Sequence, residues 1–238
     1  MKGFIFNSGR GSRLGTLTHN NPKALVPLNS KETILSRQLR LLSKYGLREF
    51  IITTGYLDNL ICDAVQPFVK RGLHIEFVYN PQFASSNAIV SMYLARNLLR
   101  DDTFFILHGD LVFDEAWVEK AFKSEFDNFA AIDASTTLNA KDFKARIRNG
   151  YISEVNVDIF EQDCVNLMPF YKMSPVALEI WMHQVKLFCE NGQSNIYAEI
   201  AANEVWNEMR VHGVSYSPYV LLEVDTPEDL EYAKIRIE

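Results

Sequence analysis

Cysteine and long apolar runs are scarce in this sequence. Its 238 residues include only three cysteines, Cys62, Cys164 and Cys189. This odd, widely spaced set matches neither a disulfide framework nor a zinc motif, and it is typical of a reducing cytoplasm. No segment approaches the ~20 apolar residues that a membrane crossing requires, and the apolar run before Asn7 is too brief for a signal peptide. We therefore expect a cytoplasmic protein that is neither secreted nor inserted into a membrane.

The sequence also lacks an excess of positive charge. Its 24 lysines and arginines against 30 aspartates and glutamates give a net charge of −6. This balance disfavours nucleic acid and anionic membrane as partners, because both select a basic surface. A small anionic ligand must therefore be bound by positive groups gathered at one site. Apolar residues make up 47% and charged residues 23%, as in soluble globular proteins. No repeat or linker is evident, so residues 1–238 are expected to form one domain, and a homo-oligomer remains open.

Strand and helix patterns alternate in the first half of the chain. A short apolar strand at 3–6 runs into a glycine-rich loop, and the apolar positions of 33–45 follow a helical period that Gly46 ends. The same alternation continues with strands at 50–53, 75–79 and 104–107 and a helix at 88–99. Strands that alternate with helices predict a mostly parallel sheet.

The second half of the chain is less regular. Strands are expected at 129–133, 151–157 and 165–171, with a turn at Asn149 and Gly150, and this predicts mixed strand pairing. Helices are expected at 175–189 and 196–209, followed by a strand at 219–224. Thr226 can cap a last helix, because Pro227 suits its first position and two acidic residues follow.

A loop rich in glycine and arginine follows the first strand directly. Residues 7–15 read NSGRGSRLG, where glycines let backbone N–H groups turn toward a phosphate and Arg13 adds a planar donor. A tight turn alone would also explain the glycines. The dinucleotide motif needs a third glycine where Leu14 stands, and the lysine ending of a P-loop is absent. The loop therefore indicates nucleotide binding without either of these two motifs.

A lysine in the next irregular stretch extends this candidate phosphate site. Lys23 follows Pro22 and could reach a phosphate held by the glycine loop, although a single lysine is more often a solvated surface charge. The combination of Gly9, Gly11, Arg13 and Lys23 at this spacing is more informative than any one of them.

Acidic residues follow two of the expected strands. Asp110 stands at the carboxyl end of an apolar strand, where open α/β sheets place ligands, so it is a candidate magnesium ligand; a turn residue or helix cap is the alternative. Glu223 and Asp225 alternate in sequence and should point to the same face of a strand, where they could share an ion with Asp110. Alternatively, Asp225 only begins the last helix. His108 is expected to be a packed residue rather than a base.

These motifs together give the chain a family resemblance. It resembles the nucleotidyltransferases of sugar-1-phosphates and amino-alcohol phosphates, which open with Gly-x-Gly-x-Arg followed by Pro-Lys. The later segments Thr54-Gly55-Tyr56, Asn80-Pro81 and Ser91-Met92-Tyr93, with Asn87 before the last, look most like phosphocholine and 2-aminoethylphosphonate cytidylyltransferases. The resemblance implies a Rossmann-like α/β nucleotidyltransferase fold, with a mostly parallel mixed central sheet flanked by helices, and a reaction that uses CTP and Mg²⁺.

The resemblance also implies roles for particular residues. Lys23 and Arg13 would act on the phosphates as catalytic residues, and Asp110, Asp225 and Glu223 would hold Mg²⁺. The nucleotide site would comprise Asn7, Ser8, Gly9, Arg10, Gly11, Ser12, Arg13, Lys23, Gly55, Tyr56, Asn80, Asn87, Ala88, Ser91 and Gly109.

Three further residues are candidates for the acceptor side. A lysine similar to Lys144 faces the acceptor in the family, although a surface charge is the alternative. Tyr197 and Glu199 could offer an aromatic face and a carboxylate to an ammonium group, or they could belong to a helix face packed on the core. The expected acceptor is phosphocholine, 2-aminoethylphosphonate, phosphoethanolamine or another small amino phosphate.

Other activities remain open from the sequence. A sugar-1-phosphate nucleotidyltransferase using UTP, GTP or dTTP is one. Many members of the family have two alanines where Asn7 and Ser8 precede Gly9, so the preferred base also stays open. A nucleotide-sensing protein without turnover is another, although Arg13 and Lys23 are both present. A glycosyltransferase would prefer two aspartates flanking one residue, and His108 occupies the first of those places.

Overall fold

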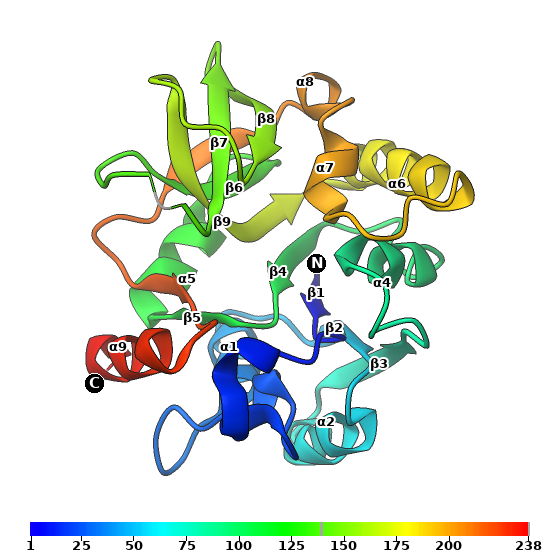
Figure 1. The fold of residues 1–238 in the computed structure, drawn as a ribbon, viewed down its shortest axis with the longest axis vertical. Helices are drawn as coiled ribbons and strands as arrows, with labels where there is room; N and C mark the ends of the chain where they lie inside the picture. Colours follow the sequence, from blue (N-terminus) through cyan, green and yellow to red (C-terminus); the bar gives the residue numbers. More distant parts are fainter. Residues whose placement is uncertain (139, 238) are drawn as a thin grey trace.

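Nine strands form one mixed sheet that organises the whole chain. A computed structural model describes residues 1–138 and 140–237. The strand order is β3-β2-β1-β4-β9-β6-β10-β8-β7 (Figure 1). The bounds are β1 (Lys2–Phe6), β2 (Glu49–Thr54), β3 (His74–Tyr79), β4 (Phe104–His108), β6 (Phe129–Asp133), β7 (Phe143–Arg148), β8 (Tyr151–Asn156), β9 (Cys164–Met173) and β10 (His212–Ser215).

The first four strands of the sheet, β3-β2-β1-β4, run parallel to one another. Phe6 is paired with Thr53 of β2 on one side and with His108 of β4 on the other. The carboxyl ends of these strands therefore lie at one edge of the sheet. The segments after β1 and β4 begin there, so the glycine-rich loop and Asp110 meet even though about a hundred residues separate them in the sequence.

Pairing in the rest of the sheet is mixed, as the sequence predicts. Strand β9 runs antiparallel to β4 and β6, and β7 and β8 form an antiparallel hairpin. Strand β10 is parallel to β6. A separate two-stranded sheet joins β5 (Leu111–Phe113) to β11 (Leu221–Glu223) in antiparallel fashion. The expected strand at 219–224 is therefore real but short, and it does not join the main sheet.

Two helical layers cover opposite faces of the sheet (Figure 1). Phe4 and Ile106 pack with α4 (Ala88–Leu94), α6 (Pro175–Glu190), α7 (Ala198–Ala202) and α8 (Trp206–Met209). Ile5 and Leu107 pack instead with α1 (Ile34–Lys44), α2 (Asp58–Ala64) and α5 (Glu115–Lys123). Neighbouring strand residues point to opposite faces, so strands covered on both sides become continuous apolar runs.

Shorter elements complete the chain. The 3-10 helices η1 (Ser12–Thr18) and η2 (Lys23–Leu25) lie between β1 and α1, and α3 (Gln66–Val69) precedes β3. The last helix, α9 (Pro227–Ile237), packs against η1 around Leu14 and Leu230. Thr226 Oγ1 accepts a hydrogen bond from the Asp229 N–H at 3.2 Å, so the expected cap is present.

Two expected helices differ from the structure. The helix expected at 88–99 ends at Leu94. The helix expected at 196–209 is divided into α7 and α8. Asn203 lies between them, and its side chain accepts from Val155 N at 2.8 Å and donates to Val155 O at 3.0 Å. These bonds tie the break to β8, and such long-range contacts are not visible in local periodicity.

No helix among the described residues combines the length and apolar character that a membrane crossing requires.

Candidate active site

A pocket of about 310 Å³ opens at the carboxyl ends of β1 and β4. Most of the predicted nucleotide-site residues line it, together with two predicted metal ligands and one predicted acceptor residue. These are Asn7, Ser8, Gly9, Gly11, Ser12, Arg13, Lys23, Asn80, Asn87, Ala88, Ser91, Gly109, Asp110, Asp225 and Tyr197. The predicted residues outside the lining are Arg10, Gly55, Tyr56, Glu223, Lys144 and Glu199.

The two strand ends approach each other too closely for a side chain at position 109. Gly109 N donates to Phe6 O at 2.8 Å. A Cβ added to Gly109 would lie 1.8 Å from Asn7 Oδ1 and 2.4 Å from Phe6 O. Position 109 is therefore restricted to glycine, and this close approach sets the distance between the glycine-rich loop and Asp110.

Gly11 brings the glycine-rich loop against Lys23. It has a φ of 67°, in the left-handed region that glycine adopts without steric cost. A Cβ at Gly11 would lie 2.7 Å from Lys23 Cβ, so the lysine stem packs directly on the loop. Lys23 and the glycine-rich loop, which lie near each other in the sequence, are thus in direct contact in the structure.

The small sheet of β5 and β11 brings the distant acidic residues to Asp110. Glu223 is paired with Leu111, and Val224 N donates to Asp110 O at 3.1 Å. Asp225 follows immediately, after the end of the strand. The sequence predicted a meeting of Glu223 and Asp225 with Asp110 from strand alternation and from the family resemblance. The structure supplies a different reason, because Asp225 lies outside the strand and β11 pairs next to Asp110.

Lys23 lies between two of these carboxylates. Its Nζ donates to Asp110 Oδ2 at 2.7 Å and to Asp225 Oδ1 at 2.6 Å. Burial alone would lower the pKa of Lys23, but the charges of Asp110 and Asp225 outweigh it and raise that pKa. Arg13 Nη2 lies 2.9 Å from the same oxygen of Asp225, and its side chain is 62% exposed. The two predicted catalytic cations therefore both meet the predicted metal ligands.

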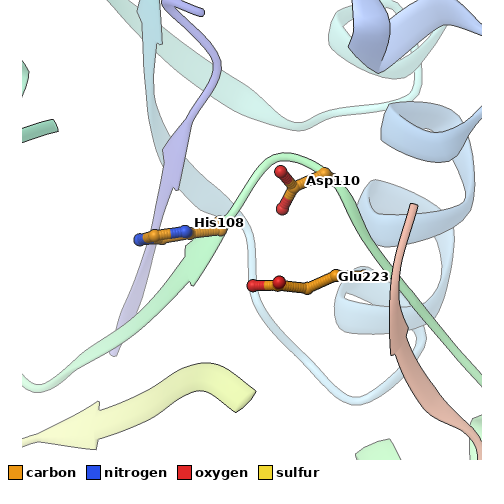
Figure 2. Close-up of side chains that lie close together, drawn as sticks. All are labelled: His108, Asp110 and Glu223. Atoms are coloured by element: carbon orange, nitrogen blue, oxygen red, sulfur yellow. The ribbon is translucent and has the colours of Figure 1, made fainter. Parts of the chain in front are cut away.

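His108, Asp110 and Glu223 form a compact cluster (Figure 2). Each offers one ligand atom, and these atoms lie within 4.8 Å of one another. Figure 2 shows the three side chains close together, with the Asp110 and Glu223 carboxylates turned toward the end of β4 that carries His108. The buried Asp110 Oδ1 has no hydrogen-bond partner among the described residues. A free carboxylate oxygen beside the second carboxylate, Glu223, fits a hard divalent cation, which prefers oxygen ligands.

Burial and neighbouring charges shift the pKa values of two members of this cluster far from their ordinary values. Burial raises the pKa of Glu223 to about 8, and the nearby Asp110 charge adds to the rise. Burial alone would lower the pKa of His108, but the Glu199 carboxylate raises it to about 9. His108 Nε2 lies 3.2 Å from Glu199 Oε1, which is an ion-pair distance, although the angle is poor for a hydrogen bond. His108 is thus packed, as expected, but it also lines the pocket.

A chain of polar side chains links the glycine-rich loop to α4. Asn80 Nδ2 donates to Ser91 Oγ at 3.1 Å, and Ser91 Oγ donates to Ser8 Oγ at 3.0 Å. Asn87 Oδ1 accepts from Ala88 N at 2.7 Å and so caps the start of α4. This wall of the pocket therefore presents hydroxyl and amide groups held in fixed positions.

Three predicted nucleotide-site residues lie outside the pocket lining and stabilise the glycine-rich loop. They are Arg10, within the loop, and Gly55 and Tyr56, beside it. The Arg10 guanidinium lies 5.1 Å from the centre of the Tyr56 ring, and the Tyr56 hydroxyl donates to His19 O. A Cβ at Gly55 would lie 2.6 Å from Ser8 O, so the loop backbone rests on this glycine. These residues therefore contact or form part of the loop and do not line the pocket.

The three predicted acceptor residues have different environments. Tyr197 lines the pocket and packs edge-on against Phe143, with ring centres 4.8 Å apart. Glu199 is fully buried, where it accepts from Tyr171 Oη at 3.2 Å. Lys144 is also fully buried, and its ammonium donates to the backbone carbonyl oxygen of residue 142 at 2.9 Å. The alternative of a surface charge at Lys144 is therefore wrong.

Several lining residues were not predicted from the sequence. They are Phe6, Ala24, Phe83, Ser86 and His108. Phe83 and Ser86 lie in the turn between β3 and α4, where no periodicity marks which side chains face inward. Their closeness to the predicted Asn80 and Asn87 was the one available signal.

The close approach at Gly109 gives a test of the site's architecture. Gly109→Ala should lower the free energy of unfolding by on the order of 2 kcal/mol or more, because its Cβ would overlap atoms of the β1 end. Urea denaturation measures this. Gly9→Ala is the matched control, since no atom lies within 4 Å of a Cβ there. Equal stability of the two variants would contradict the packing described.

The partly buried Glu223 gives a prediction about pH. Its pKa is raised from 4.5 to about 8, so the folded state keeps a proton that the unfolded chain has already lost. The stability contributed by Glu223 is therefore present below pH ~4.5 and lost as pH rises to ~8. Glu223→Gln should gain stability relative to the parent protein across this range, measured by urea denaturation with a metal chelator. The exposed Glu204→Gln is the control, and parallel curves for parent and Glu223→Gln would refute the assignment.

Comparison with known proteins identifies similar sequences. Residues 2–161 match the family model described as "Nucleotidyl transferase". The choline-phosphate cytidylyltransferase of Streptococcus pneumoniae is 28% identical over 166 residues, 70% of this chain and 56% of that protein. The mannose-1-phosphate guanylyltransferase catalytic subunit beta of Dictyostelium discoideum is 33% identical over 115 residues, 48% of this chain and 32% of that protein.

A third relative carries a phosphonate in its name. The CMP-5'-(3-aminopropyl)phosphonate synthase of Streptomyces rubellomurinus is 32% identical over 120 residues, 50% of this chain and 19% of that protein. The matches thus span between 19% and 56% of the length of these three relatives.

Solved structures share the fold over nearly the whole chain. The CTP:phosphocholine cytidylyltransferase from Streptococcus pneumoniae aligns with a TM-score of 0.77 at 20% identity, covering 98% of this chain and 97% of that one. A putative glucose-1-phosphate thymidylyltransferase from Bacillus anthracis aligns with a TM-score of 0.80 at 16% identity, covering 99% and 94%. The expected Rossmann-like α/β fold with a mixed central sheet is therefore confirmed.

Proposed function

This chain belongs to the nucleotidyl transferase family, and from that premise we propose that it is a CTP-dependent cytidylyltransferase. It joins CMP to a small phosphorylated or phosphonylated amino compound and releases pyrophosphate. The observation that carries the proposal is the meeting of Asp110 and Asp225 with Lys23 and Arg13 beside the glycine-rich loop. The names of two relatives, which refer to choline phosphate and to an aminopropylphosphonate, support CTP and the acceptor class.

The triphosphate would lie against the glycine-rich loop. Gly9 and Gly11 have no side chains of their own, so their backbone N–H groups could turn toward phosphate oxygens there. The nucleoside would contact the polar wall that includes Ser8, Asn80 and Ser91. Tyr56, Arg10 and Gly55 would serve the nucleotide indirectly, since they hold the loop in place.

Asp110 and Asp225 would hold Mg²⁺, with Glu223 beside them. The bound ion would neutralise phosphate charge and orient the triphosphate. The free Asp110 Oδ1 supports this assignment. Glu223 must lose its proton to join as a ligand, because its pKa is raised to about 8.

The transfer itself needs positioning more than proton removal. An oxygen of the acceptor phosphate attacks the α-phosphorus in line, and the bond from that phosphorus to the bridging oxygen of pyrophosphate breaks. Pyrophosphate leaves with the bonding electron pair. A phosphomonoester with a second pKa near ~6 is already largely a dianion at neutral pH, so no general base is required.

Among the side chains, Lys23 and Arg13 would contribute most to stabilising the transition state. Two polyanions repel each other, so positive groups fixed near the α-phosphoryl and pyrophosphate oxygens lower the barrier. Arg13 is 62% exposed and is paired with Asp225, and its guanidinium could turn from there toward a triphosphate. Lys23 is held by Asp110 and Asp225 until ligands arrive.

Tyr197 is the best placed of the predicted acceptor residues. It lines the pocket, and an aromatic face attracts a substituted ammonium group. Glu199 is fully buried and contacts Tyr171 and His108, so it would act by fixing neighbouring side chains. Lys144 does not line the pocket, and a direct contact with the acceptor would require it to leave its backbone partners.

A sugar-1-phosphate nucleotidyltransferase is the second candidate. The Dictyostelium relative, named as a mannose-1-phosphate guanylyltransferase, favours it with 33% identity over 115 residues. For either activity we expect a cytoplasmic protein without a nucleic-acid partner, on the basis of the few cysteines and the net charge of −6.

A matrix of nucleotides and acceptors tests the proposal. CTP, UTP, GTP and dTTP are each combined with phosphocholine, 2-aminoethylphosphonate, phosphoethanolamine and mannose-1-phosphate, and pyrophosphate release is measured. We expect release with CTP and an amino compound, and a loss of at least about 100-fold in Asp110→Asn, because a metal ligand that carries charge is removed. The exposed Glu204→Gln is the control.

Other results of the same matrix have definite meanings. Release only with mannose-1-phosphate would favour the second candidate. Nucleotide-dependent thermal stabilisation without release from any pair would indicate a sensor that has lost turnover. Full turnover in Asp110→Asn would remove Asp110 from the metal site.

A further inference from the structure

The position of Lys23 raises a question that the proposed reaction leaves open. Its ammonium is hydrogen-bonded to one oxygen of Asp110 and one of Asp225, at 2.7 and 2.6 Å. Only 13% of its side chain is exposed. The same two carboxylates are the proposed ligands of Mg²⁺. A lysine and a divalent cation are therefore assigned to one place.

The ammonium and an ion bound to the same two oxygens, Asp110 Oδ2 and Asp225 Oδ1, cannot be present together. Mg²⁺ binds carboxylate oxygens at about 2.1 Å and favours six ligands in octahedral order. An ion bound to both oxygens would lie within contact distance of an ammonium nitrogen that is itself less than 3 Å from each of them. Like charges at such a separation repel strongly in a partly buried site.

The lysine also has a reason to be there when no ion is bound. Two carboxylates in a pocket wall repel each other and lose hydration, and a nearby positive charge offsets both costs. Arg13 reaches only Asp225 and is largely exposed, so solvent screens it. Among the described residues, Lys23 is the one cation hydrogen-bonded to both carboxylates.

The backbone of Lys23 is fixed, so only its side chain can move. Its Cβ packs directly on Gly11 of the glycine-rich loop. The next residue, Ala24, is 3% exposed and belongs to the core formed with α1. A triphosphate on the glycine-rich loop would lie against the stem of Lys23 and offer its ammonium a new anion.

We propose that Lys23 is an internal competitor for the divalent cation: it occupies the position between Asp110 and Asp225 in the nucleotide-free protein and leaves when a triphosphate binds. This proposal rests on the proposed function, because it takes the same residues as the metal site. Metal and nucleotide then bind cooperatively, since the nucleotide removes the competitor and, by linkage, the metal strengthens nucleotide binding. The protein thus binds the free ion weakly and the ion with its nucleotide tightly.

The structure also contains the main alternative. His108, Asp110 and Glu223 offer ligand atoms within 4.8 Å of one another, and Asp110 Oδ1 is not used by Lys23. An ion held by this cluster would leave Lys23 in place. The two arrangements differ in whether removal of the lysine charge strengthens metal binding.

Direct metal binding distinguishes them without any measurement of turnover. The full chain is stripped of metal and titrated with Mn²⁺, and free Mn²⁺ is measured by electron paramagnetic resonance. Without nucleotide, Lys23→Met should bind Mn²⁺ at least about tenfold more tightly than the parent protein, because the competing ammonium is gone. Lys23→Arg keeps a cation and should stay close to the parent. With a non-hydrolysable CTP analogue, the advantage of Lys23→Met should shrink.

Matched variants show where the effect arises. Lys44→Met removes the same charge from an ion pair with Glu115 outside the pocket and should leave the affinity unchanged. Asp225→Asn added to Lys23→Met should abolish the gain. If Lys23→Met does not fold without metal, Lys23→Gln replaces it, since its amide can still donate to one carboxylate.

Unchanged or weaker Mn²⁺ binding in the folded Lys23 variants, or a gain that persists with Asp225→Asn, would overturn the proposal. Pyrophosphate release by the parent protein separates this failure from failure of the proposed function. Release without a gain in Lys23→Met refutes only the competition. A gain without release from any nucleotide and acceptor pair refutes only the transferase activity.

Discussion

Attraction between partly buried carboxylates and a positive charge is the interaction on which the site depends. Asp110 and Asp225 come from segments far apart in the chain and meet at the Lys23 ammonium. Carboxylates in a partly buried wall are costly to keep charged unless a cation or hydrogen bonds compensate. The site is therefore built so that some cation is always favoured there. Whether that cation is the Lys23 ammonium or a metal ion decides how the site binds metal and phosphate and how it promotes the transfer.

The fold supplies this meeting through two backbone devices. The parallel pairing of β1 and β4 brings the glycine-rich loop and Asp110 to one edge, and Gly109 allows the two strand ends to touch. The small antiparallel sheet of β5 and β11 then carries Glu223 and Asp225 to the same place, through the bond from Val224 N to Asp110 O. Both devices are made by backbone pairing and not by side-chain chemistry, and Asp110 and Glu223 contribute their backbones to the second.

Much of this arrangement could be predicted from local patterns in the sequence. Buried strands are continuous apolar runs, and glycine and lysine spacing near the first strand marks a loop that binds phosphate. The resemblance to a family added the expected partners of those residues, and Asp110, Asp225 and Lys23 do lie together. Local patterns are informative here because the carboxyl ends of parallel strands must share one edge of the sheet.

Other parts depended on contacts that local patterns do not contain. The division of α7 from α8 comes from hydrogen bonds between Asn203 and β8. Lys144 is charged, and yet it is fully buried because backbone carbonyls satisfy its ammonium. The ion pairs of Lys23 also could not be predicted, since a lysine expected to meet phosphate has no reason in sequence to contact two carboxylates first.

A crystal structure with Mn²⁺ and a non-hydrolysable CTP analogue tests the central claim most directly, because anomalous scattering locates the ion. The account predicts Mn²⁺ bonded to carboxylate oxygens of both Asp110 and Asp225, with the Lys23 ammonium moved to a phosphate oxygen. An ion bound elsewhere, with Lys23 still between the two carboxylates, would contradict it.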